Sequence, residues 1–314
     1  MLNRRLLLLS GLAAGAGLPL PAFAQGTPAQ EKPAQDKLAV VASFSILADF
    51  VREIGGERVA LTTLVGPDGD AHVYSPTPAD AKAMAAARLV IVNGLKFEGW
   101  LTRLVRSSGT KATLATATEG ITPLKLEDDG HGHGHGGEDP HAWQSVANAK
   151  LYVANILKAL SAADPAGKAL YEANAAAYQA KLDTLEGEIR AAIGRIPADR
   201  RKAITSHDAF GYFARAYGIA FIAPQGVSTE AEASARDVGR IIRQVKAQKV
   251  PAVFLENISN PRLAEQIARE SGAKVGGRLY SDALSGSEGP AGTYIAMMKH
   301  NISQIEKALA AGPA

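Results

Sequence analysis

The chain has 314 residues, of which 46% are hydrophobic, and it contains no cysteine. This length is enough for two domains with a core each, and the lack of cysteine excludes disulfide scaffolds, thiolate metal sites and cysteine nucleophiles. The 34 basic and 31 acidic residues give a formal net charge of +3, and no basic stripe with interleaved aromatic residues points to nucleic acid as a partner.

Residues 1–24 have the three parts of a secretory signal peptide. Arg4 and Arg5 give a charged start, residues 6–18 form an apolar run, and Ala24 ends a small-x-small cleavage site. The apolar run is shorter than the roughly 20 residues that a membrane span needs. We expect cleavage after Ala24, export to the periplasm by the general or the twin-arginine route, and a mature protein that is not inserted in a membrane.

After the signal, residues 25–36 are rich in Pro, Ala and Gln, which is typical of a disordered leader. Residues 37–165 then alternate short apolar runs with helical patterns, which predicts an N-terminal α/β domain. The predicted strands are 38–42, 59–65 and 89–92, and the predicted helices are 45–54, 77–87 and a stretch around 100–105.

Residues 166–194 are predicted to form one long linking helix. Its apolar residues recur at steps of three, four or seven, at Tyr171, Tyr178, Leu182, Leu185, Ile189 and Ile193. At 1.5 Å per residue this helix would be about 40 Å long, enough to extend along two domains. Pro197 follows its end.

The alternation resumes in residues 195–314, which predicts a C-terminal α/β domain of similar design. The predicted strands are 203–206, 219–223, 252–256 and 274–280, and the predicted helices are 209–217, 233–247, 261–271 and 293–309. The expected fold class is therefore α/β, with two similar parallel-sheet domains joined by one long rigid backbone helix.

Four potential metal ligands occupy equivalent positions in this pattern. His72, His207 and Asp282 each follow a predicted strand, and His141 precedes a helix. Ligands of parallel sheets bind beyond the carboxyl ends of strands, so a cleft between the domains would bring the four side chains together. Three imidazoles and one carboxylate suit tetrahedral Zn²⁺ better than oxygen-preferring octahedral ions.

The segment 128–138 is a second, different signal. It alternates glycine with His131, His133 and His135 between acidic residues, a composition that cannot pack into a core and that predicts a mobile loop. Such a loop collects metal weakly, whereas a preorganised site binds it tightly.

The chain resembles the periplasmic solute-binding receptors of zinc and manganese ABC importers, and is closest to the high-affinity zinc receptor type. The motifs that carry the resemblance are His72-Val73-Tyr74-Ser75-Pro76-Thr77-Pro78, Asn93-Gly94-Leu95, Asp139-Pro140-His141-Ala142-Trp143, Ser206-His207-Asp208-Ala209-Phe210 and Val253-Phe254-Leu255-Glu256. They occur in the family's order and cover nearly the whole mature chain.

The resemblance implies a monomeric receptor that holds Zn²⁺ with His72, His141, His207 and Asp282. It implies delivery to an ABC permease and its ATPase, with a periplasmic zinc chaperone as a further possible partner. Manganese receptors, the alternative, usually carry Glu at the third ligand position, where this chain has His207. The chain departs from the family in three ways: it cannot form the C-terminal disulfide of some zinc receptors, its His-rich loop is shorter than the longest known ones, and Ala71 stands where some relatives have Glu.

A zinc-dependent hydrolase is a less favoured alternative, because three histidines with an open fourth position can activate water. The sequence has no His-Glu-x-x-His helix and no Gly-x-Ser-x-Gly elbow, and Asp282 would fill the fourth position. We therefore expect no enzyme. Histidine must lose its proton to bind metal, so the expected affinity falls below about pH 6 to 6.5.

Three acidic residues near these histidines have open roles. Asp139 and Asp208 would orient the ligand imidazoles, or would form a turn before proline and cap a helix, respectively. Glu256 ends a strand near the expected cleft and would either orient a ligand or form a hydrogen bond between the domains.

Overall fold

The computed structural model describes residues 36–125 and 137–310. The predicted signal peptide, nearly all of the leader, and His131, His133 and His135 lie outside these ranges. The division into domains at 37–165, 166–194 and 195–314 stays a prediction, and we use the word lobe below for the elements built on each sheet.

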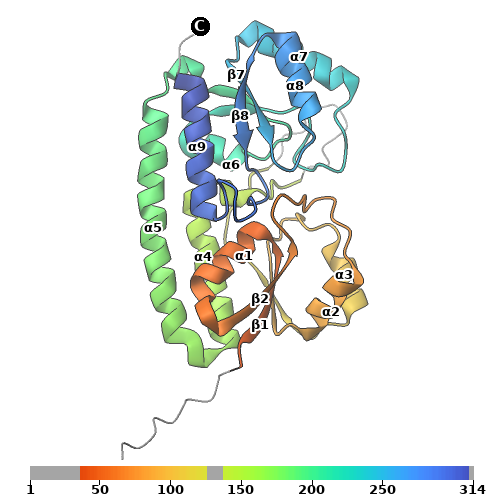
Figure 1. The fold of residues 1–314 in the computed structure, drawn as a ribbon, viewed down its shortest axis with the longest axis vertical. Coiled ribbons are helices and arrows are strands. Elements are labelled where there is room, and N and C mark those ends of the chain that lie inside the picture. Colours follow the sequence, from red (N-terminus) through yellow and green to blue (C-terminus); the bar gives the residue numbers. More distant parts are fainter. Residues whose placement is uncertain (1–35, 126–136, 311–314) are drawn as a thin grey trace, which may run out of the picture. The chain divides into compact units, whose positions relative to one another are not determined.

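The first lobe is built on a four-stranded parallel sheet in the order β2-β1-β3-β4 (Figure 1). Its strands are β1 (Leu38–Phe44), β2 (Val59–Val65), β3 (Leu89–Val92) and β4 (Thr113–Thr116). The central strands β1 and β3 are almost entirely buried, as their unbroken apolar sequences predict for strands covered on both faces. The edge strand β4 is largely exposed, and it was not predicted.

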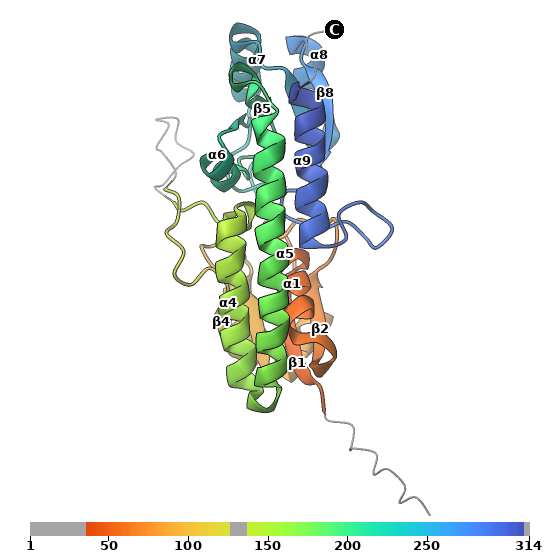
Figure 2. The same cartoon turned by 90° about the vertical axis from the view of Figure 1, so that its left-hand side faces the viewer.

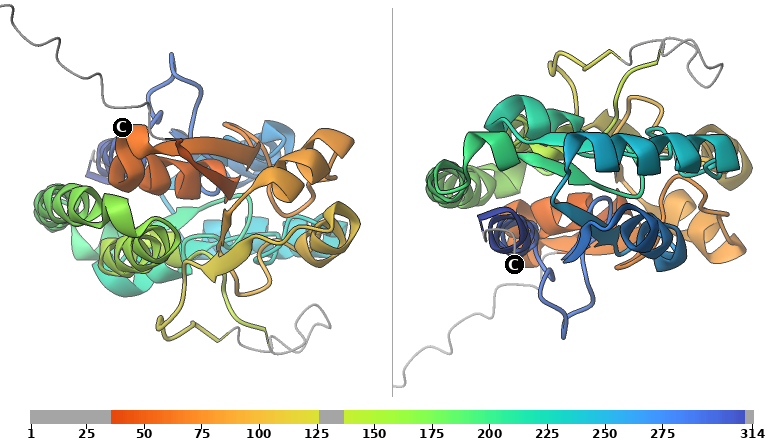
Figure 3. Two further views of the ribbon diagram at one scale, coloured as in Figure 1. Left: turned by 90° about the horizontal axis from the view of Figure 1, so that it is seen from below. Right: turned by 90° about the horizontal axis from the view of Figure 1, so that it is seen from above.

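Four α-helices cover this sheet: α1 (Ser45–Gly55), α2 (Pro78–Ala86), α3 (Leu101–Ser108) and α4 (Val146–Ala163). Helices α1 and α4 contact each other, and α2 contacts α3, so that helices lie on both sides of the sheet (Figure 3). Helix α2 begins with a capping box, in which Thr77 and Asp80 satisfy each other's backbone N–H groups, followed by proline at its first position.

The second lobe repeats this design on a parallel sheet in the order β6-β5-β7-β8. Its strands are β5 (Lys202–Ile204), β6 (Ala220–Ile222), β7 (Ala252–Glu256) and β8 (Lys274–Leu279), and its helices are α6 (Gly211–Tyr217), α7 (Ala235–Gln248), α8 (Pro261–Ser271) and α9 (Tyr294–Ala310). The strand order relative to the first strand is the same in both sheets, which confirms the predicted similarity. Short 3₁₀ helices η1 (Gly56–Arg58), η2 (Ala142–Gln144), η3 (Pro165–Gly167) and η4 (Ala198–Arg200) complete the described elements.

Helix α5 (Lys168–Gly194) is the long helix that the sequence predicted, and its 27 residues give a length of about 40 Å. It packs against α1 and α4 of the first lobe and against α6 and α9 of the second, and Figure 2 shows α4, α5 and α9 side by side. All six residues of its predicted apolar face are buried. The backbone helix therefore supports both lobes along its length.

A buried aromatic cluster joins the lobes beside α5. The ring of Phe50 in α1 lies 4.8 Å from that of Tyr294 in α9 and 5.9 Å from that of Tyr152 in α4. Next to it, Asp49 accepts the backbone N–H of Tyr294 at 2.8 Å, and its burial raises the pKa of this carboxyl to about 6. The last helix is thereby attached to the first, which limits how far the lobes can separate. Within the described residues, no helix has the length and apolarity to cross a membrane.

Candidate metal centre

The four predicted ligands meet at one point between the two sheets. His72 follows β2 through the turn 66–70, His141 immediately precedes η2, and His207 and Asp282 each lie three residues beyond β5 and β8. One donor atom from each lies within 4.8 Å of all the others. Three of the four lie beyond the carboxyl ends of strands, as the sequence pattern indicated, and the structure brings all four side chains together.

The distances match those of ligands around a single ion. The Nε2 atoms of His72 and His207 lie 3.2 and 3.1 Å from Oδ2 of Asp282, and Nε2 of His141 lies 3.6 Å from Oδ1. The Nε2 atoms of His72 and His141 are 3.3 Å apart. Two nitrogens bound to one tetrahedral zinc at 2.0–2.1 Å are about 3.4 Å apart, so the site has the size of a coordination sphere.

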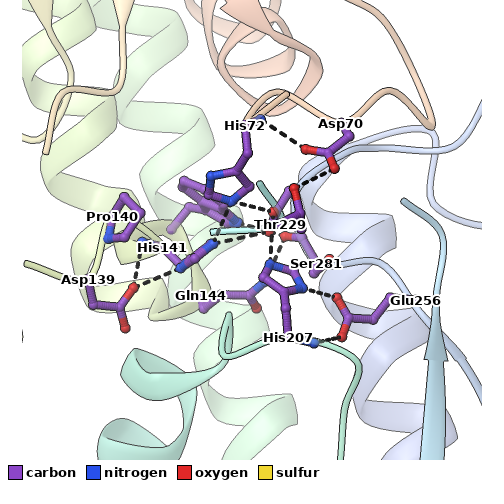
Figure 4. A network of polar contacts seen from close by, with 12 residues as sticks. Asp70, His72, Asp139, Pro140, His141, Gln144, His207, Thr229, Glu256 and Ser281 are labelled. Atoms are coloured by element: carbon purple, nitrogen blue, oxygen red, sulfur yellow. Dashed lines mark hydrogen bonds and ion pairs between the residues drawn. The ribbon is translucent and has the colours of Figure 1, made fainter. Parts of the chain in front are cut away.

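A carboxylate orients the ring of His141 (Figure 4). Oδ1 of Asp139 lies 2.8 Å from Nδ1 of His141 and also accepts the backbone N–H of the same residue at 2.9 Å. A carboxylate opposite Nδ1 favours a proton on that nitrogen and leaves Nε2 free to bind a metal ion. Both roles left open for Asp139 in the sequence are present: its bond to the backbone N–H two residues on forms the turn, and its carboxylate lies against Nδ1 of the imidazole.

Glu256, at the end of β7, is the carboxylate beside the ring of His207. Its Oε2 lies 2.6 Å from Nδ1 of His207, and its Oε1 accepts the backbone N–H groups of Ser206 and His207 at 2.6 and 3.0 Å. Asp208, the adjacent carboxylate in sequence, has an exposed side chain. The residue that orients His207 therefore comes from the neighbouring strand.

Replacing Glu256 by glutamine is expected to weaken metal binding about 10- to 100-fold, the usual effect of removing a carboxylate behind a ligand histidine. The amide N–H₂ opposite Nδ1 would favour the tautomer with its proton on Nε2, which cannot bind the ion. Competition titration with a chromogenic chelator measures the change. Glu172→Gln, which alters an exposed ion pair on α5, is the matched control, and equal affinities of the two variants would contradict this role.

The backbone around Asp282 is held by side chains from both lobes. Asn301 of α9 bonds to both the N–H and the C=O of Tyr280, at 2.9 and 2.8 Å. The carbonyl of Ser281 accepts hydrogen bonds from Trp143 Nε1 at 2.9 Å and Gln144 Nε2 at 2.8 Å. Because η2 follows His141 directly, these contacts fix Asp282 relative to His141. Sequence reasoning missed Gln144 and the role of Asn301, since both side chains bond to backbone groups that are distant in sequence.

His72 is held differently from the other two histidines. Its backbone N–H donates to Oδ1 of Asp70 at 2.9 Å, and its ring packs edge-on against Phe97, with centroids 4.7 Å apart. The carbonyl of the preceding Ala71 accepts a hydrogen bond from Trp100 at 2.7 Å. His72 is 6% exposed, whereas His141, His207 and Asp282 are fully buried.

The charges of the site are strongly coupled. Burial on its own would lower the pKa of His141, but the charge of Asp282 and the hydrogen bond to Asp139 outweigh it and raise the pKa to about 9. Burial also opposes the imidazolium of His207, yet Glu256 and Asp282 raise its pKa well above the usual value. Burial would raise the pKa of Asp282, and the two imidazolium groups instead hold it well below its usual range.

The buried carboxylate lacks full hydrogen bonding. Among the described residues, Oδ1 of Asp282 has no hydrogen-bond partner, and an unpaired buried carboxylate oxygen is costly. A divalent cation among the four side chains would satisfy it and would replace the protons that the imidazoles carry. The donor set and the unpaired oxygen both fit such an ion.

Comparison with known proteins agrees with this geometry. A family model described as "Zinc-uptake complex component A periplasmic" matches residues 40–308. The chain belongs to this family. It is therefore a solute-binding component of a metal ABC importer, with a permease and an ATPase as partners, and not an enzyme.

Individual relatives carry different metals in their names. The chain is 35% identical to the "Iron-binding protein YfeA" of Yersinia pestis over 86% of each chain. It is 33% identical to the "Manganese ABC transporter substrate-binding lipoprotein PsaA" of Streptococcus pneumoniae, over 92% of this chain and 94% of that one. The structure of the "periplasmic zinc binding protein TroA" from Treponema pallidum superposes with a TM-score of 0.82 at 32% identity, covering 88% of this chain and 100% of that one. The fold is thus that of this family, whose members are named for binding iron, manganese or zinc.

Proposed function

We propose that this protein captures Zn²⁺ in the periplasm with His72, His141, His207 and Asp282 and delivers it to an ABC permease driven by a cytoplasmic ATPase. The observation that carries the proposal is the convergence of these four donors within 4.8 Å of one another. We also propose that residues 1–24 are a cleavable signal peptide and that the receptor acts as a monomer, with a zinc chaperone as a further partner.

Zinc is favoured by the chemistry of the donors. Three of the four residues are histidines, and Zn²⁺ binds imidazole nitrogen well in closed four-coordinate sites. The carboxylates of Asp139 and Glu256 increase the basicity of two of these imidazoles. The receptor TroA, which shares the fold, is named as a zinc-binding protein.

Manganese or iron is the second candidate, and one feature of the site favours it. Both oxygens of Asp282 lie near the histidines, with Oδ2 3.1 Å from His207 and Oδ1 3.6 Å from His141. If both oxygens bound the ion, it would have five donors, which suits the higher coordination numbers of these ions. The names of the relatives YfeA and PsaA point in the same direction.

Coordination number separates the two candidates better than affinity does. Zn²⁺ binds more tightly than Mn²⁺ to almost any nitrogen and oxygen site, so a ranking of affinities would not show what the site is built for. X-ray absorption of the zinc-loaded protein is expected to show four ligands near 2.0–2.1 Å. The His207→Ala variant is expected to lose the tightly bound ion. Five or more ligands to bound zinc, or preferential retention of Mn²⁺, would contradict the zinc assignment.

We further propose that His131, His133 and His135 collect zinc weakly before it reaches the central site. A variant that lacks residues 131–135 is expected to keep one tightly bound ion per chain in metal analysis, while weak additional binding disappears in equilibrium dialysis. Loss of the tight ion from this variant would show instead that the tract belongs to the central site.

A further inference from the structure

The three ligand histidines are anchored unequally. Nδ1 of His141 lies 2.8 Å from a carboxylate oxygen of Asp139, and Nδ1 of His207 lies 2.6 Å from one of Glu256. No such carboxylate partner of the His72 ring, other than Asp282 itself, is found in residues 36–125 and 137–310. His72 is also the one member of the four with measurable exposure, at 6%. It is therefore the ligand whose movement would open the site to solvent.

Asp70 connects His72 to the opposite lobe. One carboxylate oxygen accepts the backbone N–H of His72 at 2.9 Å, and the other accepts the hydroxyl of Thr229 at 2.6 Å. The three residues lie next to one another in Figure 4. Asp70 thus bonds the His72 end of this turn to the second lobe.

Thr229 lies in the connection between β6 and α7, residues 223–234, which has no helix or strand of its own. The start of this connection is bonded to the backbone beside His207: Gln225 N–H donates to Ser206 C=O at 3.4 Å, and Asp208 N–H donates to Gly226 C=O at 3.2 Å. Asp70 therefore links the turn of His72 to a segment that is held by the neighbours of another ligand.

A second contact across the lobes provides a natural comparison. Asp68, two residues before Asp70, accepts a hydrogen bond from Asn257 Nδ2 at 3.0 Å, and its backbone N–H donates to Leu284 C=O at 2.8 Å. These bonds hold the start of the turn and do not touch His72. If the bond between Asp70 and Thr229 breaks, the start of the turn remains attached while the His72 end is free to move.

We propose that Asp70 is a positioning residue and that its hydrogen bond to Thr229 sets the rate at which the metal ion leaves the site past His72. The inference rests on the proposed metal-binding function. A hydrogen bond from a hydroxyl to a carboxylate is stronger than one between neutral groups. This bond has to break before His72 moves away from the ion. Loss of this hydrogen bond accelerates release of the metal ion more than its capture, because capture begins with the site already open.

The experiment measures the two rate constants separately with Zn²⁺ as the probe, using stopped-flow mixing with excess chromogenic chelator for release. Thr229→Val keeps the shape of the side chain and removes the donor, and it is expected to release zinc about tenfold faster with nearly unchanged capture. Thr229→Ser retains the hydroxyl and is expected to behave as the wild type. In an Asp70→Ala background, Thr229→Val is expected to add little, because the two residues act as a pair.

Asn257→Ala is the comparison variant: it does not touch His72, and it removes the neighbouring contact between the lobes together with the hydrogen bond from Asn257 Nδ2 to the carbonyl of Ala283 at 3.2 Å. Release from Thr229→Val at the wild-type rate, equally fast release from Thr229→Ser, or equal acceleration in Asn257→Ala would each overturn the proposal. Thermal unfolding of the metal-free variants shows whether each is folded. If Thr229→Val does not fold, Thr229→Ser and Asp70→Ala still test the proposal. A wild-type protein that binds no zinc would overturn the proposed function together with this inference, whereas normal binding with unchanged release would overturn the inference alone.

Discussion

Replacing Asp282 by asparagine is expected to lower the affinity for Zn²⁺ by about a hundredfold or more. Binding of structural zinc by four donors is worth roughly 10–16 kcal/mol, or about 3 kcal/mol per donor, and each 1.4 kcal/mol is a factor of ten. Asp282 is the charged donor of the set, and its oxygens lie 3.1–3.6 Å from all three imidazole nitrogens. Competition with a chelator of known affinity measures the loss.

The control for this substitution is Asp183→Asn on the exposed face of α5, where the carboxylate pairs with Lys150. Exposed ion pairs contribute little to stability, so this variant is expected to bind zinc as the wild type does. An affinity of Asp282→Asn within about threefold of the control would mean that the carboxylate is not a ligand, because a donor contributes far more than that.

Zinc affinity is expected to rise by about a hundredfold per pH unit between about pH 6.5 and 8.5, because the metal displaces about two protons. In the metal-free site the pKa of His141 is raised to about 9, and that of His207 is raised well above its usual value. Both rings are therefore protonated at neutral pH, and each must lose its proton to bind the ion. Above about pH 9 the dependence becomes shallower, since His141 no longer carries a proton to displace.

Calorimetric titrations in buffers with different ionisation enthalpies count the released protons directly. Competition titrations across the same pH range give the slope of the affinity. In Asp282→Asn the dependence is expected to move toward lower pH, because the carboxylate that stabilises both imidazolium groups is gone. A wild-type affinity that is constant between about pH 6.5 and 8.5 would contradict the raised pKa values.

The same shifts affect the stability of the metal-free fold. A histidine with a raised folded-state pKa stabilises the protein fully below its unfolded-state value, near pH 6.5, and this contribution disappears as the pH rises through the folded-state value. For His141 that upper limit is about pH 9. Protonated histidines and bound metal are thus alternative ways of neutralising the carboxylate of Asp282.

From the sequence alone, the expected loss of affinity lay below about pH 6 to 6.5. That expectation used the ordinary pKa of histidine, and the carboxylates of Asp282, Asp139 and Glu256, which raise the pKa values of His141 and His207, move the expected loss to higher pH. The pKa of a buried histidine depends on carboxylates that are distant in sequence. Such neighbours become visible only when the strands are assembled.

The fold itself was largely predictable. Strands such as β2 and β3 agree with their predicted bounds, because unbroken apolar runs between turns are a strong signal. Strand β4 was missed because it is a short, exposed edge strand. For helix α4 we expected only that a helix follows His141 and predicted no bounds, although its buried residues, among them Ala149, Tyr152, Val153 and Ile156, recur at helical spacing.

The four donors were predictable because few residue types bind metal and because these stand at equivalent places in the two halves of the chain. The side chains that position these donors were harder to predict from the sequence. The sequence left open whether Glu256 and Asp208 orient a ligand histidine and named no partner for either, and only the sheet shows that β7 brings Glu256 to the ring of His207. Asp70 and Thr229 are 159 residues apart, and no local pattern relates them.

The continuous apolar core has a consequence for engineering this receptor. One cluster of buried residues extends from Leu38 in the first sheet through Phe254 and Leu279 in the second, while a smaller cluster holds α7 and α8. A half-molecule produced alone would expose apolar surface that its counterpart normally covers. Chimeras that exchange halves between receptors for different metals must therefore preserve the buried apolar contacts between the halves as well as the metal-binding residues of each half.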